Sequence, residues 1–143
     1  RVDRLAKSAL LLEEFLAREH DAKRLSLVLR VADGTRAAVH GHCHQKAFGA
    51  MKAMRKVLGL VQGLDVSFIE SSCCGMAGSF GYEAEHFDQS MRMAELALLP
   101  AVLALEPGTL LIANGTSCRQ QIGDGAQRTP VHLARLLRDA LVT

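Results

Sequence analysis

The sequence contains few aromatic residues and no block of like charge. Phe, Tyr and Trp make up 4% of the 143 residues, Trp is absent, and 17 Lys and Arg face 15 Asp and Glu, for a formal net charge of +2. Proteins that bind nucleic acids need a clustered basic surface, and many add aromatic side chains on which bases stack. The composition therefore argues against nucleic-acid binding.

Long hydrophobic runs are also lacking. The longest one, residues 96–105, is about half a membrane span and contains Pro100. The amino-terminal residues do not form the apolar segment of a secretory signal. The sequence thus predicts a chain without a transmembrane segment, located in the cytoplasm or held peripherally at the inner face of the membrane.

The sequence does have enough apolar material for one domain. Hydrophobic residues make up 49% of the chain, and a chain of this length buries roughly two thirds of its unfolded surface without disulfides or metals. We therefore expect one domain over residues 1–143. Because the chain starts at Arg1 and enters a helical pattern at once, we expect it to be a fragment of a longer polypeptide.

Hydrophobic spacing predicts helices alternating with extended segments. The Asp33-Gly34 turn signal predicts that the first two extended segments form a hairpin or two successive strands. Residues 114–125 are predicted to be a loop with at most one helical turn. This order predicts an α/β fold, with a small, mostly parallel sheet flanked by helices and cysteine loops at the carboxyl edge of the strands. Helices are predicted at 3–19, 47–58, 87–98 and 131–141, and extended segments at 25–31, 36–40, 64–69 and 109–113.

The four cysteines all follow predicted strands. Cys43 follows the strand that ends at His40, Cys73 and Cys74 follow residues 64–69, and Cys118 follows residues 109–113. Loops after parallel strands meet at one edge of the sheet, so the four sulfurs are predicted to form a site for zinc or an iron–sulfur cluster. Isolated cysteines are otherwise small buried hydrophobes, but these lie in polar or glycine-rich segments. Without a metal, the adjacent pair would be a vicinal disulfide or a dithiol.

Residues near the cysteines are candidates for holding the same group. Gly75 gives the backbone freedom to present both adjacent thiols, and Gly78 belongs to the same tight loop. One or two of the alternating histidines are candidates to bind the metal or to donate to a cluster sulfur, with His44 ahead of His40 and His42. The alternative for His40, which ends a strand, is a satisfied core residue. No acid–base pair is evident, so no catalytic residue is expected.

Three segments carry a resemblance to a known family: HGHCHQKA at 40–47, SSCCGMAGSFGYE at 71–83 and NGTSCRQQI at 114–122. They resemble the cysteine-rich CCG domain found in the iron–sulfur subunit of glycolate oxidase and in the B subunit of heterodisulfide reductase. Their sequences are most similar to the version fused to FAD-linked D-2-hydroxyacid dehydrogenases, which implies that this chain is the C-terminal part of such a protein. The resemblance covers roughly residues 36–137.

The resemblance implies a role for each cysteine. Cys43 matches the first motif cysteine, Cys73 and Cys74 the central pair, and Cys118 the first cysteine of a closing CxxC. Gln121 stands where the second closing cysteine is expected. Four thiolates still suit a conventional [4Fe–4S] cluster, with zinc as the other cofactor.

The function implied is that of an iron–sulfur electron-transfer module. Its partners would be the flavin and ferredoxin-type domains of the parent protein, where FAD would reside, and a quinone or protein electron acceptor. The 143 residues would then not be catalytic alone. The alternatives are a structural zinc domain that mediates interactions, and dithiol–disulfide catalysis by Cys73 and Cys74.

Overall fold

The computed structural model describes residues 1–142. They form one parallel sheet of three strands, β1 (Leu29–His40), β2 (Val61–Phe68) and β3 (Leu110–Ala113). β1 lies in the middle and pairs in parallel with both neighbours, in the order β2-β1-β3. The predicted small parallel α/β sheet is confirmed.

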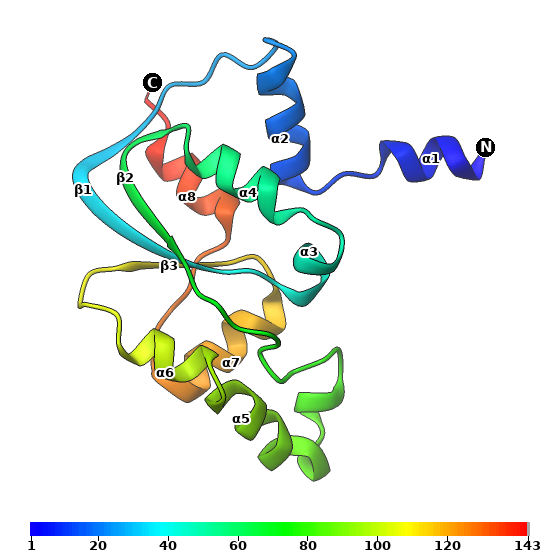
Figure 1. The fold of residues 1–143 in the computed structure, drawn as a ribbon, viewed down its shortest axis with the longest axis vertical. Helices are drawn as coiled ribbons and strands as arrows, with labels where there is room; N and C mark the ends of the chain where they lie inside the picture. The colour runs from blue at the N-terminus through cyan, green and yellow to red at the C-terminus, as the bar shows by residue number, and fades with distance from the viewer. Residues whose placement is uncertain (143) are drawn as a thin grey trace.

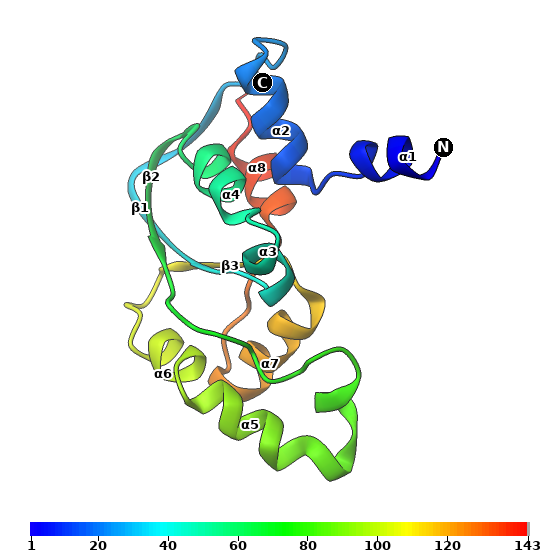
Figure 2. The same cartoon turned by 45° about the vertical axis from the view of Figure 1, so that its right-hand side comes forward.

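Helices cover the two faces of this sheet (Figures 1 and 2). The helices α2, α4 and α8 lie on one side, α5, α6 and α7 lie on the other, and α1 projects away from the rest. The short helix α3 follows directly after β1, and two 3-10 helices precede α5. The bounds are α1 Val2–Ser8, α2 Leu12–Asp21, α3 Cys43–Ala47, α4 Met51–Leu58, α5 Phe87–Glu95, α6 Leu98–Leu103, α7 Thr116–Ala126 and α8 Leu133–Ala140, with η1 Phe80–Tyr82 and η2 Ala84–His86.

Successive residues of the strands point to opposite faces and feed two separate cores. Ala37 and Val39 of β1 join Ile112 of β3 in a core with α2, α4 and α8. Ala38 of β1 joins Leu111 and other residues in a core with α5, α6 and α7. The second core also contains Cys74 and Cys118. The sheet therefore separates an aliphatic core from a core that contains cysteine.

The predicted hairpin around Asp33-Gly34 is wrong. Residues 29–40 form one strand, and both halves pair in parallel with β2, with Leu29 opposite Val61 and Thr35 opposite Leu64. The register shifts between these pairs, and Gly34 has φ +80°. A glycine with positive φ makes a bulge here instead of a reversal, because both halves share one partner strand.

Helix boundaries also differ from the prediction. The segment 3–19 is divided between α1 and α2 by extended backbone at Ala9 and Leu11, and 47–58 and 87–98 each hold parts of two helices. Residues 114–125, predicted as a loop, mostly form α7. The helix was not predicted because glycines are typical of loops. A Cβ at Gly125 would lie 2.6 Å from the Leu99 side chain, so the glycine lets α6 pack closely.

Within residues 1–142, no helix is both long enough and apolar enough to cross a bilayer.

Candidate metal centre

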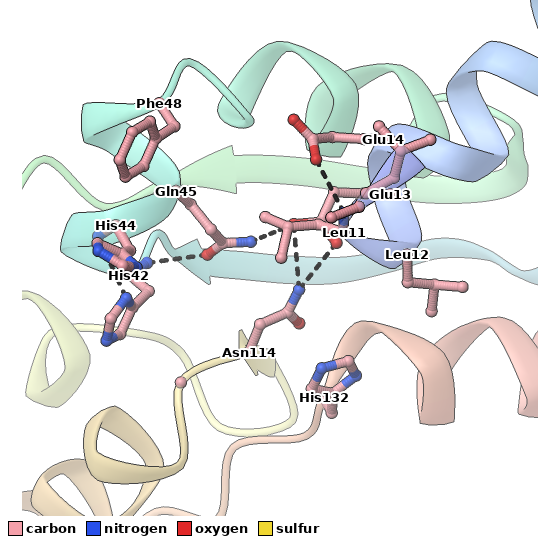
Figure 3. Close-up of a pocket in the computed structure, with 13 residues that line it drawn as sticks. Leu11, Leu12, Glu13, Glu14, His42, His44, Gln45, Phe48, Asn114 and His132 are labelled. Atoms are coloured by element: carbon pink, nitrogen blue, oxygen red, sulfur yellow. Dashed lines mark hydrogen bonds between the residues drawn. The ribbon is translucent and has the colours of Figure 1, made fainter. Parts of the chain in front are cut away.

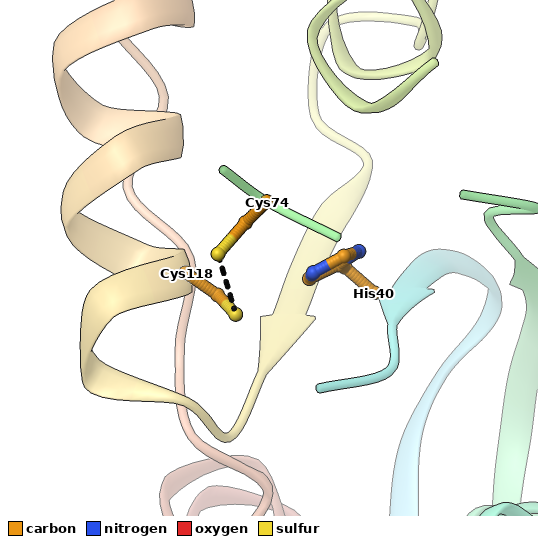
Figure 4. Close-up of side chains that lie close together, drawn as sticks. All are labelled: His40, Cys74 and Cys118. Carbon is orange, nitrogen blue, oxygen red and sulfur yellow. Dashed lines mark hydrogen bonds between the residues drawn. The ribbon is translucent and has the colours of Figure 1, made fainter. Parts of the chain in front are cut away.

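His40, Cys74 and Cys118 converge at the carboxyl edge of the sheet. His40 is the last residue of β1, Cys74 lies in the loop after β2, and Cys118 lies in the first turn of α7. One ligand atom from each residue lies within 4.8 Å of the other two, and all three residues are buried. Figure 4 shows the imidazole ring beside the two sulfur atoms. Three residues distant in sequence thus offer metal-binding atoms at one point.

A hydrogen bond joins the sulfur atoms of Cys74 and Cys118. Cys118 donates a hydrogen bond to Cys74, with 3.3 Å between the sulfurs. This bond, helped by His40 and the Met76 backbone N–H and opposed by burial, lowers the pKa of Cys74 to about 4. The same bond, together with burial, raises the pKa of Cys118. These opposite shifts favour the thiolate form of Cys74, and a thiolate is the form of cysteine that binds metals.

His40 is buried but only half satisfied. Its Nδ1 lies 2.9 Å from the hydroxyl oxygen of Ser71, whereas its buried Nε2 has no hydrogen-bond partner among the described residues. The prediction of a core histidine is borne out by the burial, while the expected satisfaction of both ring nitrogens is not found. Most buried polar atoms in proteins have a partner, so the free Nε2 beside two cysteines is informative.

Cys43 and Cys73 lie outside this group of three. Cys43 is exposed at the start of α3, with its sulfur 4.0 Å from His42 Nδ1. Cys73 is partly buried, and its sulfur accepts a hydrogen bond from the Gly75 N–H at 3.3 Å. Both are close enough that their charge contributes to the raised pKa of Cys118. Their predicted part in the same site stays a prediction.

The loop that carries Cys73 and Cys74 is held from two sides. Lys46 of α3 donates to the carbonyl oxygens of Ser71 and Ser72. Gly75 has φ +91°, and a Cβ there would lie 2.1 Å from the Ser90 carbonyl oxygen of α5. Only glycine fits this position, in agreement with its predicted role of freeing the backbone.

Gly78 differs from Gly75. It is exposed with φ +69°, and a Cβ there would meet nothing within 4 Å. Its left-handed backbone explains the glycine without any ligand, and its predicted contact with a cofactor stays a prediction.

Gln121, at the position of the expected closing cysteine, is buried and tied to α5. Its side-chain nitrogen donates to the carbonyl and hydroxyl oxygens of Ser90, both at 3.1 Å. This amide joins α7 to α5 close to Gly75. Gln121 thus has a structural contact where the resemblance implied a ligand.

His44 lines a cavity next to the cysteines. The cavity measures about 710 Å³ and is also lined by His42, Phe48 and His132 (Figure 3). The rings of His44 and Phe48 meet edge to face, 5.2 Å apart. A Cβ at Gly115 would lie 2.5 Å from the His42 ring and 2.9 Å from the Cys118 sulfur. Gly115 therefore packs closely against both the His42 ring in the cavity wall and the Cys118 sulfur of the buried site.

Glu13 in the wall of this cavity connects two of the cysteine-bearing segments. Its buried carboxylate accepts hydrogen bonds from the side-chain amides of Gln45 in α3 and Asn114 after β3. Gln45 in turn accepts from the His42 N–H at 3.0 Å, and Asn114 accepts from the Leu133 N–H at 3.0 Å. These bonds fix both amides with their NH₂ groups toward Glu13.

Comparison with known proteins finds relatives among dehydrogenases. The chain is 26% identical over 102 residues to the C subunit of anaerobic glycerol-3-phosphate dehydrogenase of Escherichia coli (strain K12), covering 71% of this chain and 25% of that protein. It is 29% identical over 116 residues to D-2-hydroxyglutarate dehydrogenase of the same strain, covering 80% of this chain and 11% of that protein. The corresponding enzyme of Pantoea ananatis (strain AJ13355) is 35% identical over 60 residues, 42% of this chain and 6% of that protein.

The chain therefore spans a quarter or less of the length of these relatives. No family model matches the chain, and no solved structure matches it. The comparisons place its relatives among oxidoreductases. They leave the CCG family as a resemblance carried by the three cysteine segments.

Proposed function

We propose that this chain is the iron–sulfur electron-transfer module of an FAD-linked 2-hydroxyacid dehydrogenase. The observation that carries the proposal is the buried group at the sheet edge, where Cys74 and Cys118 meet an imidazole nitrogen without a partner. The similarity to dehydrogenases adds a redox context. When bound, an iron–sulfur cluster accepts and passes on single electrons.

The residues proposed to hold the metal centre are the four cysteines, Cys43, Cys73, Cys74 and Cys118. The lowered pKa of Cys74 favours its thiolate form, and the Gly75 backbone lets the adjacent pair occupy one tight loop. Hydrogen bonds from backbone N–H groups to sulfur, such as that from Gly75 to Cys73, tune such centres. Gly78 and His44 are proposed to support the centre from outside.

The rest of the electron path is proposed to lie in other parts of a longer protein. Hydride chemistry would take place on FAD in a flavin domain, and ferredoxin-type clusters would connect it to this module. The acceptor would be a quinone or a protein, met in the cytoplasm or at the inner face of the membrane. The chain by itself would catalyse no reaction.

A structural zinc centre is the second candidate, and the sulfur spacing favours it. Two thiolates on one tetrahedral zinc ion, each about 2.3 Å from it, lie about 3.8 Å apart. The Cys74 and Cys118 sulfurs are 3.3 Å apart, so one ion fits after a small movement. In a cubane cluster each thiolate binds a different iron, so these sulfurs would have to separate further. On this alternative the domain would mediate interactions without redox activity.

Anaerobic reconstitution of the purified chain with iron and sulfide separates the two candidates. The electron-transfer proposal predicts visible charge-transfer bands that bleach on reduction, with a matching EPR signal. Cys118→Ser should abolish these bands, whereas the matched control Ser117→Ala should retain them. Stoichiometric zinc with no such bands, both in the chain and in the longer parent protein, would overturn the electron-transfer proposal.

A further inference from the structure

We infer that His40 binds the metal centre directly through its Nε2 atom. This inference rests on the proposed function only in that a metal occupies the site. It differs from the ligand set given by the resemblance, which is made of cysteines alone. The side chain in question is 1% exposed, and Nε2 has no partner within the described residues.

The contact of the other ring nitrogen prepares His40 for this role. Nδ1 lies 2.9 Å from the Ser71 hydroxyl oxygen, and a hydroxyl group can accept a hydrogen bond. When Nδ1 carries the ring proton and donates it to Ser71, Nε2 holds a free lone pair. Metal-binding histidines almost always donate their second ring nitrogen to such an acceptor, which fixes both tautomer and orientation.

The backbone around His40 holds the ring in place. His40 ends β1 and pairs with Ala113 of β3 in the sheet register. Lys46 donates to the carbonyl oxygen of Ser71 and so positions the residue whose hydroxyl meets Nδ1. A strand end supported from two sides is more rigid than a free loop. The ring is therefore directed toward Cys74 and Cys118 before any metal binds.

The proposed site combines two kinds of donor. The thiolates of Cys74 and Cys118 and the imidazole of His40 provide three ligands, and either Cys43 or Cys73 provides the fourth. Cysteine and histidine together are a common donor set for zinc. In an iron–sulfur centre, replacing thiolate ligands by imidazole raises the reduction potential. A neutral ligand also lowers the negative charge that must be buried among these apolar residues.

The first experiment uses zinc alone and detects the ring nitrogens by NMR. The reduced chain, labelled with ¹⁵N-histidine, is titrated with Zn²⁺ under anaerobic conditions. We expect the Nε2 resonance of one histidine to move to a metal-bound position, in the control His20→Gln, at the exposed end of α2, as in the unaltered chain. In His40→Gln this change should be absent. Loss of an outer-shell partner typically weakens metal binding roughly 10–100-fold, so loss of a ligand should weaken it by about 100-fold or more.

His40→Gln alters a buried residue and could prevent folding, so the second experiment needs no change at His40. The chain is reconstituted with iron and sulfide, and pulsed EPR of the reduced centre is recorded with ¹⁴N- and ¹⁵N-histidine. We expect a strong nitrogen coupling that changes with the isotope and survives both His42→Gln and His44→Gln. Zinc binding that leaves every histidine nitrogen resonance in place, or an assembled centre without histidine coupling, would overturn the inference.

The two experiments also separate this inference from the proposed function. If zinc moves the His40 resonance but neither the chain nor the longer parent protein assembles an iron–sulfide centre, His40 is a ligand and the electron-transfer proposal fails. If a redox-active centre assembles without histidine coupling, the electron-transfer proposal stands and the inference about His40 fails.

Discussion

The two faces of the sheet differ in the chemistry that they bury. Toward α2, α4 and α8, the core is aliphatic, with Val39, Leu58, Ile112 and Leu133 almost completely enclosed. Toward α5, α6 and α7, buried Cys74 and Cys118 share the interior with the polar side chains of Ser90 and Gln121. His40 belongs to this second side, because it follows Ala38 by two residues on β1.

This comparison indicates that the aliphatic face contributes most of the folding stability, whereas the other face carries the candidate metal-binding side chains. Burial of branched aliphatic side chains favours folding. Among the described residues, the buried polar side chains on the first face are Glu13 and the Gln45 that donates to it. Buried polar atoms cost free energy unless they find partners. On the second face, His40 Nε2 has no partner among the described residues and lies beside the sulfurs of Cys74 and Cys118, as expected for the ligand site proposed above.

The largest effect on stability is expected on the aliphatic face. Ile112→Ala removes a fully enclosed side chain from the centre of β3 and should lower the free energy of unfolding by about 2–5 kcal/mol. Urea denaturation followed by circular dichroism measures this loss. The matched change on the other face, Cys118→Ala, removes a smaller side chain and should cost less stability while abolishing metal binding. Equal losses from both changes would contradict the division of roles.

Alanine substitutions at Gly75 and Gly78 test how closely the loop that carries Cys73 and Cys74 packs against α5. Gly75→Ala combines a left-handed backbone with a Cβ 2.1 Å from the Ser90 carbonyl oxygen, and should cost at least about 1–3 kcal/mol and disturb Cys74. Gly78→Ala meets open space and should cost only the backbone strain, about 1 kcal/mol. Unfolding curves and metal titrations of both variants check this. Similar behaviour of the two variants would mean that the Ser90 contact is unimportant.

Glu13 tests whether the two faces are independent. Glu13→Gln places an amide NH₂ group against the amides of Gln45 and Asn114, which already point their own NH₂ groups inward. Leaving buried donors unsatisfied should cost about 1–3 kcal/mol. Because Gln45 also binds the His42 N–H beside Cys43, the thiol of Cys43 should react with a labelling reagent at a changed rate.

The control for Glu13 is the neighbouring Glu14→Gln. Within residues 1–142, Glu14 accepts a side-chain hydrogen bond from the exposed Leu11 N–H at the start of α2 and from no other group, so the change should have a small effect on stability and none on Cys43. If Glu13→Gln proved as mild as this control, the cysteine loops would not depend on α2.

The smallest expected effect concerns pH and His132, beside the cavity. Burial, together with the Arg119 charge and opposed by Glu13, lowers the pKa of His132 below its usual 6.5. The unfolded chain then binds a proton more readily, so the free energy of unfolding should fall as pH decreases through about 6.5. His132→Asn keeps an acceptor for the Ala134 N–H and should make this pH dependence shallower. Denaturation between pH 5 and 8 measures the change, and an unaltered slope would contradict it.

Much of the fold could be predicted because it depends on local spacing. The apolar repeats placed most helices, and the strand segments at 64–69 and 109–113 agree with β2 and β3 to within a few residues. The α7 helix escaped prediction because its glycines and polar residues look like a loop. One of these glycines, Gly125, allows the Leu99 side chain of α6 to pack closely against α7. Such a contact between helices produces no periodic pattern in the local sequence.

The sequence predicted that thiols would converge at the sheet edge, and the structure brings two of them together with His40. Cysteines after successive strands indicated a shared site, and Cys74 and Cys118 do meet. His40, His42 and His44 alternate along the chain, so spacing could not tell which of them faces the site. The structure selects His40, which lies on the strand itself, whereas His42 caps α3 and His44 turns toward Phe48.

The sequence by itself determined the α/β class, the order of most elements and the placement of thiols after strands, since these depend on short-range periodicity and composition. The tertiary structure alone decided that β1 is one continuous central strand, and that His40 joins Cys74 and Cys118. Both depend on pairing between segments far apart in the chain. Such pairing is set by the total packing of the sheet against its helices, which no single stretch of sequence encodes.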